Sequence, residues 1–261
     1  MKKSRKNAFD IEDLRGKLAG SRKYVDFRKT YTAKFPEIPD LNTPKLWDEL
    51  NNRQQISRQE SPMTFHKLKI ISGYIQDVPI KVLNIGCGGG DLEHVIFGKE
   101  KNIKVKWFGV DISPKSISKC KKAFPEARFS VGNIKDLKFR NQSFDLVILM
   151  EILEHIRAHD TFKALSEVKR VLKKRGKLII SIPLNEGLPE MIKRGQNPNA
   201  HVRAYSPEVI RTEMKLAGFK IIKENFLYAF QRYYFLKTFI VKFILKGFRK
   251  PNNMIIYAEK L

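Results

Sequence analysis

The sequence predicts an α/β protein built on a doubly wound, mostly parallel sheet with helices on both faces. Three observations predict this fold class. Short apolar runs alternate with segments of helical periodicity, a glycine cluster follows the first strand-like run, and 261 residues suit one sizeable core with additions. Strands that alternate with helices form parallel sheets covered on both faces. We therefore expect one main domain over 61–261, preceded by an N-terminal cap.

Residues 1–60 are predicted to form this helical cap rather than part of the sheet. They are polar and basic, and several prolines interrupt them. Thr43 followed by Pro44 predicts a short helix through Trp47 and Leu50, because threonine caps a helix and proline fits its first turn.

Five apolar runs are predicted to be the parallel strands. They are KVLNI (81–85), KVKWFGV (104–110), ARFSV (127–131), FDLVILM (144–150) and KLIISI (177–182). Two later runs, FKIIKENFLY (219–228) and NNMIIYAEK (252–260), predict closing strands.

Ser-Pro pairs mark the starts of three predicted helices, at 61–62, 113–114 and 206–207. The last of these helices is predicted to stop at Gly218. The first carries apolar residues at helical spacing, namely Phe65, Leu68, Ile71 and Ile75. Another helix, around Phe162 to Leu172, has a single apolar face.

The loop after the first strand, GCGGG at 86–90, is predicted to bind a nucleotide. Ligands of doubly wound sheets bind beyond the carboxyl ends of the strands, and glycines let a ligand approach the backbone closely. The spacing G-x-G-x-G differs from the dinucleotide pattern G-x-G-x-x-G. Asp111 ends the second strand, where a carboxylate can accept both ribose hydroxyls. These residues fit an adenosine without fixing what is attached to it.

In combination, these motifs resemble the class I S-adenosylmethionine-dependent methyltransferases, over roughly residues 62–228 and the last strand. The resemblance implies a Rossmann-like seven-stranded sheet in the order 3-2-1-4-5-7-6 with the last strand antiparallel, and S-adenosylmethionine as cofactor. The implied cofactor-binding positions are Asn84, Gly86, Cys87, Gly88, Gly90, Asp111, Ile112, Asn133, Ile134 and Met150.

Two positions depart from the family pattern. Asn84 stands where the family usually has an acid, and Asn133 where an aspartate commonly meets the adenine. Both asparagines still offer a carbonyl acceptor. A Rossmann-like domain that binds a nucleotide without chemistry, or binds NAD, is the alternative.

The segment after the fourth strand, MEILEH (150–155), gathers two acids and a histidine. If it is helical, positions i, i+3 and i+4 share a face, and such Glu-His pairs are also common as plain structure. Polyprenyl dihydroxybenzoate methyltransferases and small-RNA 2′-O-methyltransferases look similar here. Their resemblance implies Glu151, Glu154, His155 and His201 as ligands of Mg²⁺ or Mn²⁺. Without a metal, His155 or His201 would act as general base beside Glu154.

An insertion at 229–250, between the last two predicted strands, has the composition of an amphipathic helix. Basic residues lie along one stripe and aromatic and aliphatic residues cover most of the rest. Such a helix suits an anionic membrane surface over the active-site mouth. Packing on the cap, a homodimer contact and an RNA-stacking surface are the alternatives.

Charge and cysteine content bear on partners and compartment. The net charge is +24, which favours polyanions without choosing between nucleic acid and lipid, and the two cysteines are too few for a disulfide framework. No run of 18 apolar residues occurs. We expect a cytoplasmic protein, peripherally membrane-associated if 229–250 binds lipid.

The sequence thus favours an O-methyltransferase of a small hydrophobic or lipid-linked acceptor. A nucleic-acid partner, as in an RNA 2′-O-methyltransferase, is the first alternative, and a non-catalytic nucleotide-binding scaffold is the second.

Overall fold

The structure is a computed structural model that describes residues 31–35, 38, 40, 42–50, 61–75, 80–98 and 104–261. Most of the predicted N-terminal cap therefore lies outside the described residues. The main domain is described apart from 76–79 and 99–103.

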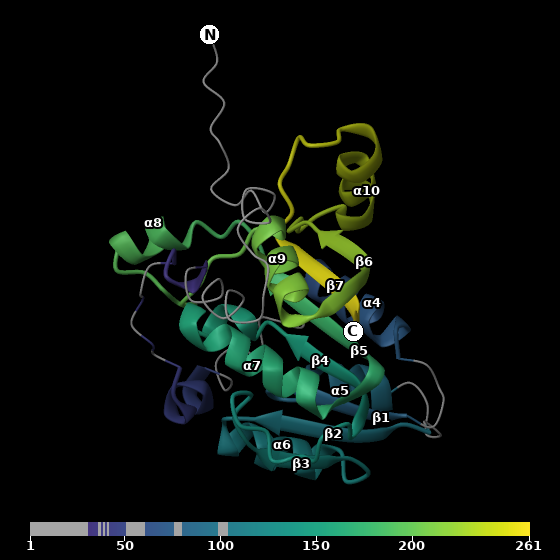
Figure 1. Ribbon diagram of the computed structural model, residues 1–261. Helices are drawn as coiled ribbons and strands as arrows, with labels where there is room; N and C mark the ends of the chain where they lie inside the picture. Colours follow the sequence, from purple (N-terminus) through teal and green to yellow (C-terminus); the bar gives the residue numbers. More distant parts are fainter. Residues whose placement is uncertain are drawn as a thin grey trace.

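Seven strands form one sheet in the order β3-β2-β1-β4-β5-β7-β6 (Figure 1). The first five strands pair in parallel, and β7 is antiparallel to both of its neighbours. The predicted strand order and the antiparallel last strand are confirmed. The strands are β1 (Lys81–Ile85), β2 (Lys106–Asp111), β3 (Arg128–Val131), β4 (Phe144–Met150), β5 (Leu172–Pro183), β6 (Phe219–Leu227) and β7 (Asn253–Lys260).

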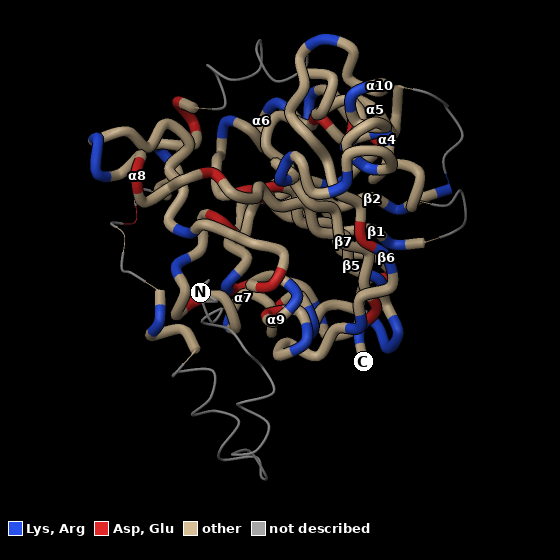
Figure 2. Tube along the Cα trace, turned by 90° about the horizontal axis from the view of Figure 1, so that it is seen from above, with Lys and Arg blue, Asp and Glu red and all other residues tan. Residues whose placement is uncertain are grey.

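Helices cover both faces of the sheet, which Figure 2 shows from above. One apolar core joins the sheet to α7 (Ala158–Val171) and α9 (Pro207–Ala217). The other core joins the opposite face to α4 (Pro62–Gly73), α5 (Asp91–Phe97) and α6 (Pro114–Ala123). The remaining segments are η1 (Leu153–His155), α8 (Leu188–Lys193), α10 (Tyr234–Phe239) and η2 (Ile240–Ile244).

The predicted helix starts and stops are found where the sequence places them. Ser113 and Ser206 cap their helices by accepting backbone hydrogen bonds, and Gly218 ends α9 with a φ of 80°. Residues 44–50 are helical, and Thr43 Oγ1 accepts from the Leu46 amide at 3.2 Å. Ser61 precedes α4 but makes no capping bond with its side chain.

Two features differ from the predicted pattern. Phe65, expected on the apolar face of its helix, is 58% exposed, while Leu68 and Ile71 are buried as predicted. The 229–250 segment is not one long helix: α10 continues only into the π-helical turn η2. Within the described part of the chain, no helix is both long enough and apolar enough to cross a bilayer.

Candidate active site

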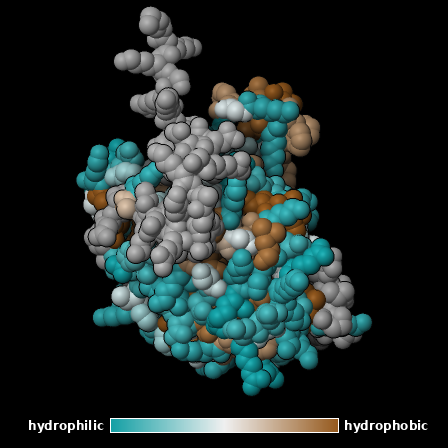
Figure 3. Space-filling model, in the orientation of Figure 1, coloured by the Kyte–Doolittle hydropathy of each residue, from teal (hydrophilic) through white to brown (hydrophobic). Residues whose placement is uncertain are grey.

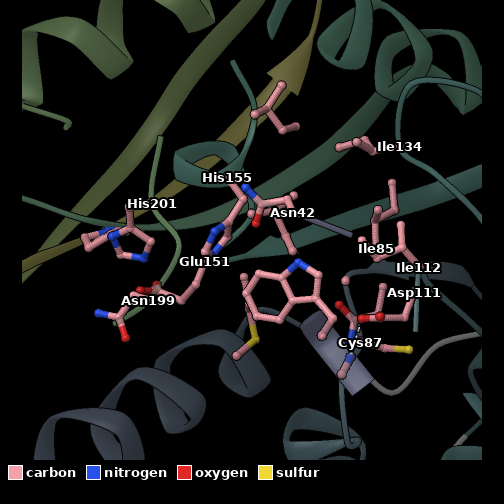
Figure 4. A pocket seen from close by; sticks show the side chains of 18 of the residues that line it. Asn42, Ile85, Cys87, Asp111, Ile112, Ile134, Glu151, His155, Asn199 and His201 are labelled. Atoms are coloured by element: carbon pink, nitrogen blue, oxygen red, sulfur yellow. Dashed lines mark hydrogen bonds between the residues drawn. The ribbon is translucent and has the colours of Figure 1, made fainter. Parts of the chain in front are cut away.

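A cavity of about 540 Å³ opens at the carboxyl edge of the sheet. Its lining includes residues of α4, of the loops after β1, β2, β3, β4 and β5, of the start of β7 and of the short helix 44–50. Figure 4 shows Cys87 and Asp111 toward one end and His201 and Asn199 toward the other. The volume lies in the range of small-molecule sites, so one continuous space can hold a nucleoside cofactor and an acceptor.

The glycine loop bends in conformations that other residues rarely adopt. Gly86, Gly88 and Gly90 have φ values of 73°, 51° and 89°. A Cβ at Gly86 would lie 1.9 Å from Ile152 Cδ1, and one at Gly90 would lie 2.6 Å from Phe124 Cε2. Because these glycines have no side chains, the loop backbone can pack closely against Ile152 and Phe124. The other side of the loop backbone lines the cavity.

Asp111, predicted to bind ribose, is buried at the end of β2 and lines the cavity. Its two carboxylate oxygens accept from the Gly88 amide at 2.9 Å and from the Ser113 amide at 2.8 Å. Burial raises the pKa of Asp111 despite these bonds. Each oxygen has a second lone pair, so the carboxylate is fixed in place and can still accept from two hydroxyls.

Asn84 is backed by an acid that the sequence analysis did not identify. Its Nδ2 donates to Glu93 Oε1 at 2.9 Å, and Trp107 Nε1 donates to the same oxygen at 2.8 Å. Among the residues that the structure describes, none gives a hydrogen bond to the buried Asn84 Oδ1, and Asn84 lines the cavity. Position 84, which usually carries an acid in this family, therefore presents the amide oxygen of Asn84 to the cavity. The carboxyl group of Glu93 lies behind Asn84 and binds its amide nitrogen. The signal in the sequence was Glu93 in the first turn after the glycine loop.

The ten predicted cofactor residues fall into two groups. Nine of the ten line the cavity, whereas Gly90 lies behind the loop against Phe124. Asn133, expected at the adenine, is exposed, and its Oδ1 accepts from the Lys135 amide at 2.9 Å. Ile112, Ile134 and Met150 supply apolar wall.

Glu151 does not lie with the other three residues predicted as metal ligands. It has a φ of 53°, which is strained for a residue with a side chain. Its carboxylate pairs with Lys67 Nζ at 3.1 Å and accepts from Ser181 Oγ at 2.6 Å and from Asn253 Nδ2 at 3.0 Å. Burial alone would raise the pKa of Glu151, but the Lys67 charge and these bonds lower it to about 2. Glu151 is therefore an ionised partner of Lys67, a residue that the sequence analysis missed.

Glu154, His155 and His201 do come together. One ligand atom from each lies within 4.8 Å of the others. Glu154 is fully buried, and neither carboxyl oxygen has a hydrogen-bond partner in the described part of the chain. Burial, reinforced by the charge of Glu151, raises the pKa of Glu154 well above its ordinary value.

Hydrogen bonds of the two imidazoles define their tautomers. His201 Nδ1 lies 2.6 Å from Glu186 Oε2, and His155 Nδ1 lies 3.3 Å from the carbonyl oxygen of Ala200. Because a carboxylate and a carbonyl accept, the proton of each neutral ring belongs on Nδ1, and Nε2 is the basic nitrogen. Trp47, from the helix 44–50, contacts the His155 ring edge to face, with centroids 4.7 Å apart.

A buried network holds the segment that carries His201. The Glu154 carbonyl oxygen accepts from the amides of Val202 and Arg203. The Arg203 guanidinium, 3% exposed, pairs with Glu213 of α9 and also donates to the Tyr205 hydroxyl at 2.8 Å. The sequence pattern contained no sign of this ion pair, because the helix that became α9 had been identified only by its start at Ser206-Pro207 and its stop at Gly218.

Known proteins resemble this chain in the region of the sheet and the cavity. A family model described as "Methyltransferase domain" matches residues 76–232. An uncharacterized protein of Methanocaldococcus jannaschii is 30% identical over 147 residues, 56% of this chain and 58% of that protein. The demethylmenaquinone methyltransferase of Thermotoga maritima is 29% identical over 126 residues, 48% of this chain and 52% of that protein.

A third relative is the ubiquinone/menaquinone biosynthesis C-methyltransferase UbiE of Campylobacter jejuni. It is 30% identical over 117 residues, 43% of this chain and 48% of that protein. The chain thus spans about half the length of the curated relatives it matches.

Solved structures with the same fold include a methyltransferase and an enzyme whose name gives another reaction, a cyclase. The S-adenosylmethionine-dependent methyltransferase of Methanosarcina mazei matches with a TM-score of 0.54 at 18% identity, over 74% of this chain and 97% of that one. The [4+2]-cyclase SpnF matches with a TM-score of 0.58 at 18% identity, over 76% and 81%. At these identities the structures show the fold alone. The family match covers more than half of the chain, so the protein belongs to the methyltransferase domain family.

Proposed function

We propose that the protein transfers a methyl group from S-adenosylmethionine to a hydroxyl oxygen of a small hydrophobic or lipid-linked acceptor. The observation that carries the proposal is the cavity itself. It joins the glycine loop and Asp111 at one end to His155 and His201 at the other, inside one space.

The residues at the first end fit S-adenosylmethionine. Asp111 would accept from the ribose hydroxyls, and the side-chain-free loop would lie against the nucleoside. The unpartnered Asn84 Oδ1 would accept from the amino group of the methionine part. When bound, the cofactor supplies a methyl group already activated by its sulfonium.

The residues at the second end suit removal of a proton from the acceptor. His155 lines the cavity with its basic Nε2 set by the hydrogen bond at Nδ1. His201 is held in the corresponding tautomer by Glu186. Imidazole takes up a proton near neutral pH, so either ring can receive the hydroxyl proton, with Trp47 excluding water over His155.

A divalent ion fits this cluster less well than the sequence predicted. Glu151 is engaged by Lys67, which leaves one carboxyl group and two imidazoles. Mg²⁺ prefers six oxygen ligands, whereas imidazole suits Zn²⁺, Fe²⁺ or Ni²⁺. The unpartnered Glu154 oxygens favour a cation as the second candidate, and a bound ion would lower the pKa of an acceptor hydroxyl.

The names of two relatives support a ring-containing, hydrophobic acceptor and raise carbon methylation as the alternative to oxygen. Both are methyltransferases of quinone compounds, and one is named a C-methyltransferase. Loss of a hydroxyl proton would assist either outcome, because it increases the electron density of the ring and of its oxygen. The RNA alternative has the basic charge of the chain in its favour.

The test is transfer of labelled methyl from S-adenosylmethionine into a cell extract that is then split into lipid, small-molecule and RNA fractions. We expect label in the lipid or small-molecule fraction, on oxygen by product analysis. His155→Ala should slow transfer by about 10²–10⁴-fold while leaving cofactor affinity unchanged, and His159→Ala, at an exposed histidine, is the matched control. Label confined to RNA would exclude the proposed acceptor, and loss of transfer on adding a chelator would assign the cluster to a metal.

A further inference from the structure

We propose that residues 232–250, here called the α10 surface, dock onto an anionic lipid bilayer. The inference goes beyond the proposed acceptor and is independent of it, because binding to a bilayer requires no methyl transfer. The basis is the orientation of α10 and η2, whose large apolar side chains mostly face away from the rest of the protein.

The α10 surface presents its apolar side chains outward. The side that packs on the protein consists of Tyr234, Thr238 and Val241, and Thr238 is one of the polar residues of the segment. Tyr234 OH lies 3.0 Å from His66 Nδ1 of α4, and the rings of His66 and Phe235 are 5.4 Å apart. A helix on the surface of a water-soluble protein normally turns its apolar side toward the core. In this segment the apolar side faces outward instead.

The exposed apolar residues form a continuous group. Among the described residues, eight of the twelve large hydrophobic side chains that are exposed belong to this one segment. They are Tyr233, Phe235, Leu236, Phe239, Phe243, Ile244, Leu245 and Phe248. Figure 3 shows the corresponding hydrophobic area over α10. A patch of this kind on an otherwise polar surface marks an interaction site.

The charge of the segment identifies the kind of partner. Residues 229–250 contain six basic residues and no acidic one. Lys237, Lys246 and Lys250 are exposed beside the apolar group, and Lys242 and Arg249 are half-buried. Lysine and arginine at the border of an apolar face meet lipid phosphates while the apolar side chains enter the interface.

This combination fits a bilayer better than RNA or a second copy. Bases stack on aromatic rings, whereas Leu236, Ile244 and Leu245 offer only aliphatic surface. A two-fold contact between identical segments would bring together the six positive charges of each copy, with no acidic residue in either segment to offset them.

The position of the α10 surface links it to the cavity. It packs on His66, and the neighbouring α4 residues Thr64 and Lys67 line the cavity. Phe65, between them in sequence, is 58% exposed and extends the apolar area. A bilayer on this surface would therefore lie next to α4, which forms part of the cavity wall.

The experiment is co-sedimentation of the full chain with vesicles of phosphatidylcholine and phosphatidylglycerol, compared with vesicles of phosphatidylcholine alone. We expect binding to the anionic vesicles that decreases with added salt. Phe239→Ser combined with Phe243→Ser, whose rings are 5.0 Å apart, should weaken binding by about tenfold or more. Lys237→Gln combined with Lys246→Gln should weaken it roughly fivefold per residue.

Two control variants distinguish binding through the α10 surface from nonspecific hydrophobic or electrostatic binding by the rest of the protein. Ile222→Ser removes an apolar side chain that is 48% exposed on β6, and Lys121→Gln with Lys122→Gln removes two exposed charges on α6. Both controls should bind anionic vesicles like the unchanged protein. All the altered side chains are exposed, so thermal unfolding should be unchanged and would reveal any folding defect.

Three results would overturn the proposal. The first is no binding to anionic vesicles, or binding that the phenylalanine changes leave intact. The second is concentration-dependent self-association that the same changes abolish, which would assign the surface to a second copy. The third is salt-sensitive RNA binding through the lysines, with no affinity for vesicles.

Discussion

The buried carboxyl group of Glu93 makes the stability of this protein depend on pH in a way that one substitution should remove. Burial raises the pKa of Glu93 from its ordinary 4.5 to about 7, although Asn84 and Trp107 both donate hydrogen bonds to it. The folded state therefore binds this proton more tightly than the unfolded state. Its contribution to stability is fully present below pH 4.5 and is lost as the pH rises through about 7.

The size of the effect follows from the two pKa values. They differ by about 2.5 pH units, and each unit corresponds to about 1.4 kcal/mol, so roughly 3 kcal/mol of unfolding free energy is lost across this range. Glu93 is fully buried, so solvent does not screen the effect. A change of this size is a large part of the stability of an ordinary domain.

The assay is urea unfolding of the unchanged protein and of Glu93→Gln at about pH 5 and about pH 8. Glutamine resembles the protonated acid and cannot ionise. The loss of stability between the two pH values should therefore be roughly 2–3 kcal/mol smaller in the variant. Other buried acids, Glu154 among them, also destabilise the protein as the pH rises, so only the difference between the two proteins is diagnostic.

Glu126→Gln, at an exposed position, is the control and should lose as much stability as the unchanged protein. Equal losses in Glu93→Gln and the unchanged protein would mean that Glu93 is ionised in the fold at neutral pH, and the reasoning from burial would be refuted.

Three further predictions concern the cavity. Asp111→Asn should weaken S-adenosylmethionine binding about tenfold to a hundredfold in calorimetry, because charge-assisted hydrogen bonds to the ribose are lost; unchanged affinity would remove Asp111 from the site. Gly86→Ala should destabilise the fold by about 1–3 kcal/mol and impair cofactor binding, since its Cβ would overlap Ile152. The control is Gly195→Ala, at a φ of 69° with nothing within 4 Å, which should reduce stability only through backbone strain. Lys67→Met should cost about 3–5 kcal/mol by leaving the Glu151 carboxylate unpaired, and Glu151→Gln in the same chain should restore part of it; additive losses would show that the two groups do not interact.

The sheet could be predicted from the sequence because its signals are local. Each strand is a short apolar run, and each of α6 and α9 begins at a Ser-Pro pair whose serine caps the first turn. The order of the strands came from the resemblance to a known family. The position of the glycine loop and Asp111 then followed from the ends of β1 and β2, which neighbour each other in the sheet.

The orientation of α10 was beyond reach of the same reasoning. Helical periodicity divides a segment into an apolar and a basic side, but it does not say which side meets the protein. Here the Tyr234 side contacts α4 through His66, a residue 168 positions earlier, and Thr238 on the same side is buried. The π-helical turn at Ile240–Ile244 also shifts the later residues away from the spacing of an α-helix.

The motif MEILEH shows how one backbone angle decides the chemistry of a site. On an α-helix, Glu151, Glu154 and His155 would share one face and could surround a metal. Instead Glu151 has a φ of 53° and only Leu153–His155 form a helical turn. The first acid therefore faces Lys67, Ser181 and Asn253, while the second remains beside the histidines. Despite its burial, Glu151 has a lowered pKa because Lys67, Ser181 and Asn253 stabilise its charge, whereas burial and the charge of Glu151 raise the pKa of Glu154. The strained angle at Glu151 thus goes with a carboxylate that pairs with Lys67 and stays outside the group formed by Glu154, His155 and His201.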